Sequence, residues 1–465
     1  MLIFGFFSKH VLTIQWEIKY NEDTNFRINN STVRSFHMNE KLFSYIASSP
    51  TAYHACATSA EMLKAKGYTE LFEGKKWEIE EGKGYFVKRN GSSVIAFRIP
   101  KGGFDGFMIA ASHGDSPCLK IKENAEMADK YFVRLSTETY GGMIYSTWLD
   151  RPLAVAGRVA VKTENGILIK LVDTKEPVAL IPNVAIHMNR QVNSGMNFNA
   201  AVDMIPLYGG ESEKDSFKNR IAALAGVSAD EILTTDLFLY NPQAGYEWAS
   251  FISAPRLDDL QCAFSSLEAF FASEKETCGG LPVYALFDNE EVGSQTKQGA
   301  ASTFLYDTLK RVVKALGGDE DTYLRYVANS FMVSCDNAHS IHPNHPEHAD
   351  KNHTVHMNGG VVIKYNANQK YTSDAVSVAL FKSICDEAGV PTQYYANRAD
   401  MPGGSTLGNI ANTQVSLNTV DIGLAQLAMH SSFETAGKDD TEYMVRALTA
   451  FYSSGIKSTD AGYEF

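Results

Sequence analysis

Several short apolar runs in this chain stop abruptly at residues that can bind metals or move protons. The run at 281–287 (LPVYALF) is followed by Asp288, Asn289, Glu290 and Glu291. Four to eight apolar residues bounded by turn-forming residues are typical of a strand buried on both faces of a parallel sheet. The pattern therefore predicts a strand with two adjacent carboxylates at its carboxyl end, where open α/β sheets place their chemistry.

The same arrangement occurs elsewhere in the chain. The run FMIAAS ends at His113, the run SFMVS leads to Asp336, and a single long run at 418–427 leads to His430. Asp258 begins a predicted helix whose apolar residues recur at i, i+3, i+4 and i+7. Each of these polar residues lies at the end of an element, so one cleft could collect all six candidates: His113, Asp258, Glu290, Glu291, Asp336 and His430.

These residue types favour a centre that holds two metal ions. Successive candidates lie tens of residues or more apart, which excludes a zinc finger, whose ligands cluster locally. Two histidines and three carboxylates suit two borderline metal ions that share one carboxylate. Neighbouring Glu290 and Glu291 point in different directions on an extended segment, so one can bind a metal ion while the other moves protons.

Five segments around these residues resemble, in order, motifs of the aspartyl aminopeptidase family of dinuclear zinc metallopeptidases. They read HGDSPCL, APRLDDL, DNEEVGS, SCDNAHSIHPN and LAMHSS, and GGMIYSTWLDRPLAVAGRV, IPNVAIHMNR and MPGGSTLGNI are also similar. The resemblance runs from about Met38 to the C-terminus. It implies an α/β peptidase domain with a mixed, largely parallel sheet flanked by helices, together with an inserted β-rich dimerisation domain.

The resemblance also implies a role for each candidate. His113 and Asp336 would bind one metal ion, Glu291 and His430 would bind the other, Asp258 would bridge the two, and Glu290 would be the general base. The implied cofactors are two zinc ions per subunit. Cobalt and manganese stay open as alternatives, because these metals also accept histidine and carboxylate ligands.

Four further residues are candidates for supporting roles. Asp115 can accept a hydrogen bond from the far imidazole nitrogen of His113 and fix its tautomer. His339 and Lys364 are candidate substrate-binding residues, although Lys364 could equally be a solvated lysine at a strand end. Asp259 is expected to be a dipole-matching acid at a helix start that tolerates replacement. The histidine-rich loop at 339–356 is not expected to bind the catalytic metal ions.

His187 is a candidate substrate-binding residue contributed by a second subunit. Val184, Ile186 and Met188 alternate with other residues, so the pattern predicts a strand with His187 on its more polar face. An ordinary surface or hydrogen-bonded strand histidine is the alternative. The matching family segment supplies a histidine that reaches the metal centre of a neighbouring subunit, and the resemblance implies a homodimer that assembles into a homododecamer.

The resemblance and the change of pattern along the chain give four predicted regions. Residues 1–37 form an N-terminal extension, which is either an appended or disordered segment or not translated, if synthesis begins at Met38. Residues 38–116 and 246–465 form the peptidase domain, and residues 117–245 form the dimerisation domain. The apolar start LIFGFF has no basic segment before it and no small-residue cleavage site after it, so a signal peptide is not predicted.

Composition narrows the class of protein. A chain of 465 residues with 44% apolar and 21% charged residues is typical of a globular protein with room for two cores. The net charge of −12 argues against nucleic acid as a partner. No apolar run approaches the roughly 18 residues that span a bilayer, so no membrane partner is predicted. Six cysteines without a CxxC pair favour free thiols and a cytoplasmic location.

Together these features predict a cytoplasmic metalloaminopeptidase that removes one residue at a time from the N-termini of peptide substrates. The family name implies a preference for Asp or Glu, and a preference for neutral side chains is the alternative. A carboxypeptidase or deacylase would share the same metal ligands but read the other end of the substrate. A self-assembling scaffold with a structural metal is the alternative that is not an enzyme.

Overall fold

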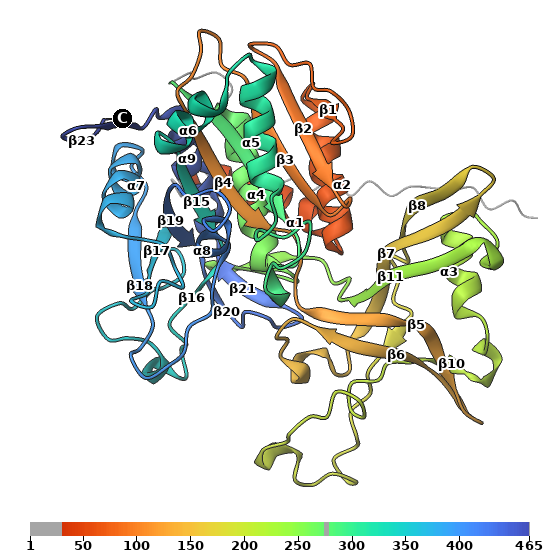
Figure 1. Cartoon of the computed structure of the whole chain (residues 1–465). Coiled ribbons are helices and arrows are strands. Elements are labelled where there is room, and N and C mark those ends of the chain that lie inside the picture. The colour runs from red at the N-terminus through yellow and green to blue at the C-terminus, as the bar shows by residue number, and fades with distance from the viewer. Residues whose placement is uncertain (1–29, 274–278, 465) are drawn as a thin grey trace, which may run out of the picture.

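The computed structural model describes residues 30–273 and 279–464. Most of the expected N-terminal extension lies outside these residues. Within them, the chain forms two regions, each built around a sheet of its own (Figure 1). No helix in this described part of the chain is both long and apolar enough to cross a membrane.

The larger region is organised by a nine-stranded sheet. Its four central strands, β14, β4, β15 and β19, run parallel, whereas β3 pairs antiparallel with β14 and β17 pairs antiparallel with β19. The mixed, largely parallel sheet expected from the sequence is confirmed. In spatial order its strands are β1 (Thr69–Leu71), β2 (Gly84–Arg89), β3 (Ser93–Arg98), β14 (Gly280–Phe287), β4 (Gly106–His113), β15 (Phe331–Cys335), β19 (Asn418–Gly423), β17 (Val361–Tyr365) and β18 (Thr392–Ala396).

Helices cover both faces of this sheet. Along β4, Met108 and Ala110 pack into one hydrophobic core, whereas Phe107, Ile109 and Ala111 pack into the other. This alternation explains why the strand is apolar throughout. One face carries α1 (Asn30–Ala47), α2 (Ala52–Ala65), α4 (Leu257–Ala272), α7 (Ala375–Glu387) and α9 (Asp440–Ser453), and the other carries α5 (Phe304–Ala315), α6 (Glu320–Ala328) and α8 (Leu407–Ala411).

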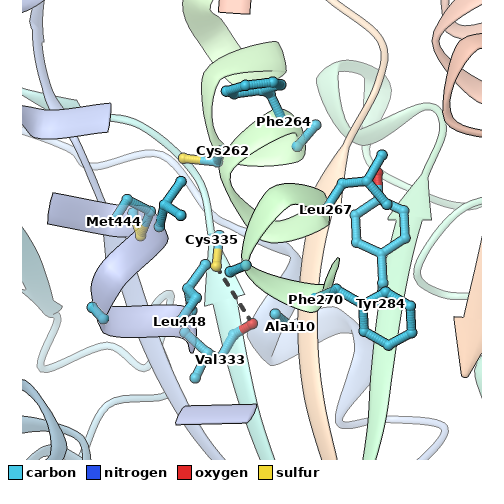
Figure 2. Packing of buried hydrophobic residues seen from close by; sticks show 14 of the residues in the cluster. Ala110, Cys262, Phe264, Leu267, Phe270, Tyr284, Val333, Cys335, Met444 and Leu448 are labelled. Carbon is cyan, nitrogen blue, oxygen red and sulfur yellow. Dashed lines mark hydrogen bonds between the residues drawn. The ribbon is translucent and has the colours of Figure 1, made fainter. Parts of the chain in front are cut away.

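Helix α4 lies in the middle of the first core. Its apolar stripe, predicted from the sequence, is buried, and Figure 2 shows Phe264, Leu267 and Phe270 projecting from it, with Met444 and Leu448 of α9 nearby. Burying one such side chain contributes roughly 1.5–3 kcal/mol. The helix is therefore held firmly, and so is Asp258 at its start.

A smaller, five-stranded sheet lies near the ends of β15 and β19, because β16 and β20 follow these two strands closely along the chain. It contains β12 (Tyr246–Trp248), β13 (Phe251–Ala254), β21 (Glu434–Gly437), β20 (Ala425–Leu427) and β16 (Ala338–His339). The single strand expected over 418–427 was wrong, because β19 ends at Gly423 and β20 belongs to this second sheet. A side chain at Gly423 would lie 2.0 Å from the carbonyl oxygen of Asp336, so the chain needs glycine where it changes sheets.

The second region is β-rich, as the sequence predicted, and has its own hydrophobic core. Its strand pairings are antiparallel, and β11 bonds to both β5 and β7, which closes most of the sheet into a ring. The strands are β5 (Cys118–Ala128), β6 (Phe132–Tyr140), β7 (Pro152–Thr163), β8 (Gly166–Asp173), β9 (Ala179–Leu180), β10 (Leu207–Gly210) and β11 (Ile232–Tyr240), with α3 (Phe217–Ala225) packed beside them; β22 (Lys457–Thr459) and β23 (Gly462–Glu464) form a separate hairpin near the C-terminus.

Candidate metal centre

A cavity at the carboxyl edge of the central strands gathers the candidate ligands. His113 ends β4, Asp336 follows β15, and Glu290 and Glu291 follow β14. These residues therefore lie at or just after the ends of three neighbouring parallel strands, at one edge of the sheet. Asp258 and His430 come shortly after β13 and β20 of the smaller sheet. The cavity is lined by His113, Asp258, Glu290, Glu291, Asp336, Asn337, Ala338, His339, Lys364, Tyr371, Tyr395, Gly404, Ser405, Thr406, Met429 and His430.

Two groups of potential ligands meet at Asp258. His113, Asp258, Asp259 and Asp336 offer ligand atoms within 4.8 Å of one another, and so do Asp258, Glu291 and His430. The Oδ1 atom of Asp258 lies 3.6 Å from Nε2 of His113, whereas its Oδ2 atom lies 3.3 Å from Nε2 of His430. The two oxygens of one carboxylate therefore face two different groups, which is the geometry a bridging ligand needs.

The donor set fits divalent cations. Among the described residues, buried Asp258 Oδ1 and Glu291 Oε1 have no hydrogen-bond partner, although orphaned buried oxygens are costly. Burial, reinforced by the charge of Asp258, raises the pKa of Glu291 well above its ordinary value. Burial works against protonation of His430, but its bond to Asp258 and the charge of Glu291 raise its pKa to about 10. The cluster thus favours positive charge, and metal ions with oxygen and nitrogen ligands would supply it.

Glu290 lines the cavity without belonging to either group of ligands. It begins the short helix η6 (Glu290–Val292), after Asn289 in the left-handed backbone region at φ 62°. Burial and the nearby carboxylates of Asp336 and Asp115 raise the pKa of Glu290 to about 8. A carboxyl group with a pKa of about 8, placed beside potential metal ligands, is suited to exchange protons.

Asp115 holds the turn that carries both glutamates. Its carboxylate accepts the backbone N–H groups of Glu290 and Glu291, each at 3.2 Å. Its backbone carbonyl lies 3.1 Å from Nδ1 of His113, closer than its own Oδ1 at 3.4 Å. The sequence predicted that the carboxylate would orient His113. In the structure the carbonyl is the nearer acceptor for the ring, and the carboxylate mainly positions the two glutamates.

Lys364 is buried rather than solvated. Its side chain is 3% exposed, and Nζ donates to the carbonyl oxygen of Asn337 at 2.8 Å and lies 3.5 Å from Oδ1 of Asp336. It therefore places a positive charge in the cavity wall beside one potential metal ligand. His339 lies at the same cavity, exposed, with its ring 6.1 Å from that of Tyr395.

His187 does not lie at this cavity in its own subunit. The strand predicted for its segment was wrong, because residues 186–188 form a turn within a long loop between β9 and β10. Val184, Ile186 and Met188 are exposed by 50%, 49% and 79%. Alternation of apolar residues was misleading here, because none of these side chains is buried within the chain. The loop projects away from the second region (Figure 1).

Glu434 is a functional residue that sequence reasoning missed. It is 2% exposed, and its two carboxyl oxygens accept the backbone N–H groups of Asp258 at 3.0 Å and His430 at 2.7 Å. One side chain thus fixes the backbone of two candidate ligands that lie 172 residues apart (430 − 258). Its position four residues after His430 is the only local signal, and a buried β-strand acid is not recognisable from that spacing.

Asp259 was also misjudged from the sequence. It is fully buried, and its Oδ2 atom accepts the backbone N–H of His113 at 3.2 Å. Burial raises its pKa well above the ordinary value. The exposed position expected for this acid was therefore wrong, because its carboxyl is buried and joins the start of α4 to the end of β4.

Comparisons with known proteins agree with this site. The family described as "Aminopeptidase I zinc metalloprotease (M18)" matches residues 45–452. The "Probable M18 family aminopeptidase 2" of Clostridium novyi (strain NT) is 43% identical over 425 residues, covering 89% of this chain and 98% of that protein. The corresponding protein of Clostridium acetobutylicum is 43% identical over 426 residues, with 89% and 98% covered.

Solved structures are similar over almost the same length. The cryo-EM structure of the Ape4 and Nbr1 complex matches with a TM-score of 0.87 and 33% identity, covering 91% of this chain and 86% of that one. The S. cerevisiae mApe1 dodecamer matches with a TM-score of 0.77 and 28% identity, covering 90% and 97%. Because the family match spans most of the chain and the relatives are this similar, the chain belongs to the M18 family of zinc aminopeptidases, which are hydrolases that act on peptides.

Proposed function

We propose that this aminopeptidase uses two zinc ions per subunit and prefers peptides with N-terminal Asp or Glu. The observation that carries the first part is the position of Asp258 between two groups of ligands. His113 and Asp336 would hold one ion, and Glu291 and His430 would hold the other. When bound, the ions would supply a Lewis acid that polarises the substrate carbonyl and lowers the pKa of water to about 7. Cobalt or manganese would fit the same ligands.

Glu290 would carry the proton transfers. Its carboxylate would accept a proton from the attacking water and return it to the amine that leaves. The bonds from its backbone and that of Glu291 to Asp115 fix the turn, so the Glu290 side chain stays in the cavity instead of competing for a metal ion. Without metal ions the pKa of Glu290 is about 8. The positive charge of bound ions would lower that pKa, which would keep the base ionised near neutral pH.

The preference for acidic residues rests on the charge of the cavity wall. Buried Lys364 provides a positive charge beside the ligands, and Tyr371 and Tyr395 line the same wall with polar hydroxyl groups. An acidic side chain of the substrate would be attracted there, and His339 at the rim would add a second hydrogen-bonding group. Lys364 is partly neutralised by Asp336, so a preference for neutral residues is the competing outcome.

Initial rates on a panel of aminoacyl substrates would test this proposal. Asp and Glu substrates should give higher kcat/KM than Ala and Leu substrates, and Lys364→Gln should reduce the ratio between Glu and Ala. N-acetylated versions of the same substrates should not be cleaved, because an aminopeptidase recognises a free amine. Cleavage of the N-acetylated substrates would indicate a deacylase or carboxypeptidase, and equal rates on all four side chains would contradict the acidic preference.

We also propose that residues 117–245 form a dimerisation domain between two parts of a peptidase domain, 38–116 and 246–465, and that dimers assemble into a dodecamer. The support is the similar mApe1 dodecamer and the exposed apolar surface of this region. Ile167, Leu168 and Ile169 on the edge strand β8 are 65%, 49% and 51% exposed. Contiguous exposed apolar residues on an edge strand are typical of an interface between copies.

The exposed loop around His187 would complete the active site of a neighbouring subunit in this assembly. There His187 would contact the substrate carbonyl or the oxyanion formed from it, a contact worth on the order of 2.7–4 kcal/mol if it resembles one oxyanion-hole donor. Light scattering would report the mass of the assembly. A monomer at micromolar concentration would contradict both the dodecamer and the shared site.

A cytoplasmic location is proposed with the enzyme. The described cysteines are free thiols, which supports a reducing compartment. Fractionation of cells, followed by detection of the protein, would decide this point, and recovery from the secreted fraction would contradict it.

A further inference from the structure

The histidine-rich loop after β16 places imidazole rings side by side on the surface. The backbone N–H of His345 bonds to the carbonyl of His342, and that of His348 bonds to the carbonyl of His345, both at 3.2 Å. These are consecutive i to i+3 turns, the second forming the short helix η7 (Pro346–His348). Side chains three residues apart eclipse one another in such turns. The rings of His342 and His345 are accordingly 5.3 Å apart, and those of His345 and His348 are 5.6 Å apart.

One of these rings bonds to a carboxylate, and a second ring lies close to it. The Nδ1–H group of His345 donates to Oε1 of Glu347 at 3.0 Å. His345, Glu347 and His348 each offer a ligand atom within 4.8 Å of the others, and all three are exposed. His342 is different, because its Nδ1 atom accepts the backbone N–H of Asn344 at 3.2 Å. That bond leaves the proton on its other nitrogen, so His342 offers no lone pair to the group.

The backbone of this loop is held from outside. Pro346 restricts the first turn of η7, and the Arg398 guanidinium donates to the carbonyl oxygen of Glu347. Arg398 also forms two bonds of 2.6 Å with the carboxylate of Asp400. The positive charge of Arg398 is therefore balanced by Asp400, so the carboxylate of Glu347, which accepts a bond from His345, keeps its negative charge to balance a cation.

We propose that His345, Glu347 and His348 form a surface site for a divalent transition-metal ion, separate from the catalytic centre. Two imidazoles and one carboxylate are ligands of the kind that select zinc, nickel and copper over magnesium and calcium, and nickel and copper bind such ligands more strongly than the earlier metals of the series. Water would complete the coordination. None of the three residues lines the catalytic cavity, and none belongs to either group of ligands there.

Nickel binding to the zinc-loaded enzyme would test the site. The enzyme, without any histidine tag, would be loaded with zinc, dialysed, and titrated calorimetrically with nickel chloride. His345→Ala and His348→Ala are the test variants. His353→Ala is the matched control, because His353 is an exposed histidine of the same loop that also bonds a carboxylate, Asp350 at 2.9 Å, but lies outside the group of three ligands. Thermal melting and peptide hydrolysis would be measured for all variants.

The wild type and His353→Ala should bind one additional nickel ion per chain, and both test variants should lose that binding while their melting and hydrolysis stay unchanged. A wild type that binds no additional nickel, or test variants that bind as the wild type does, would overturn the proposal. Nickel that only displaces zinc from the catalytic centre would inhibit hydrolysis equally in all variants, and this too would overturn it. None of these results depends on which substrate the enzyme prefers.

Discussion

Replacing Glu434 by Gln should weaken metal binding although Glu434 is not a proposed ligand. Its two carboxyl oxygens each accept one backbone N–H group, from Asp258 and from His430. In the variant, one of those oxygens becomes an NH2 group, which cannot accept a bond. One buried N–H is then left without a partner, at a cost of about 1–3 kcal/mol. If that cost falls on the metal-loaded conformation, zinc affinity drops by roughly 5- to 160-fold.

The assay is competition between the metal-free enzyme and a chelator of known zinc affinity, followed by kcat at saturating zinc. We expect weaker zinc binding with much of kcat recovered when zinc is in excess, because the ligands themselves are intact. In other metal sites, replacing a residue that holds a metal ligand in place weakens metal binding by about 10–100-fold, which is the same range. Unchanged zinc affinity would refute the idea that Glu434 positions both ligands.

Asp440→Asn is the matched control for this experiment. Asp440 is also a fully buried carboxyl that accepts two backbone N–H groups, from Asn358 at 2.7 Å and from Gly360 at 3.1 Å, but it lines no part of the metal cavity. Its replacement should lower the free energy of unfolding by a similar amount and leave zinc affinity unchanged. If Asp440→Asn weakens zinc binding as much as Glu434→Gln does, the loss reflects general destabilisation.

Three further predictions follow from the site and its surroundings. Asp258→Asn should lower the occupancy of both metal ions, whereas His430→Ala should empty chiefly one, and metal analysis of the purified variants checks this; equal loss in both would contradict the bridge. Inactive His187→Ala and inactive Glu290→Gln subunits, when co-assembled, should recover partial activity through mixed sites, and mixtures that assemble but stay inactive would contradict the shared site. Burial lowers the pKa of His54 to about 4, so the folded protein binds fewer protons than the unfolded chain, whose His pKa is about 6.5. The contribution of His54 to the free energy of unfolding is complete above pH 6.5 and is lost as the pH falls towards 4, by up to about 3 kcal/mol. Chemical denaturation across this pH range should therefore show a smaller loss of stability for His54→Gln than for the wild type.

The sequence predicted well those parts of the fold that local pattern determines. Continuous apolar runs at β4, β14 and β15 are buried on both faces, and this is why they could be recognised without a partner in view. The chemistry at their ends followed, because the carboxyl ends of neighbouring parallel strands meet at one edge. The pattern therefore predicts that His113, Glu291 and Asp336 lie near one another, and they line one cavity.

Other features depend on contacts that local pattern does not contain. The run at 418–427 reads as one strand, but close packing of Gly423 against Asp336 divides it between two sheets. Asp259 resembles a surface acid at a helix start until the end of β4 is placed over it. The segment around His187 alternates as a strand does, although its apolar side chains are exposed within the subunit. In each case the outcome depends on the surroundings of the residue in the folded chain, which local pattern does not contain.

The division of labour between Glu290 and Glu291 is the central claim, and metal analysis of two single variants tests it most directly. Glu290→Gln should keep both metal ions and lose activity by about 10²–10⁴-fold, which is the usual contribution of a general base. Glu291→Gln should lose the ion that it shares with His430 and lose activity as a consequence. Plasma emission spectrometry of the purified proteins, with kcat measured on the same samples, gives both quantities. The predicted result is that Glu290→Gln keeps its full metal content although its activity is greatly reduced, whereas Glu291→Gln loses both metal and activity. Equal metal loss in the two variants would contradict the account.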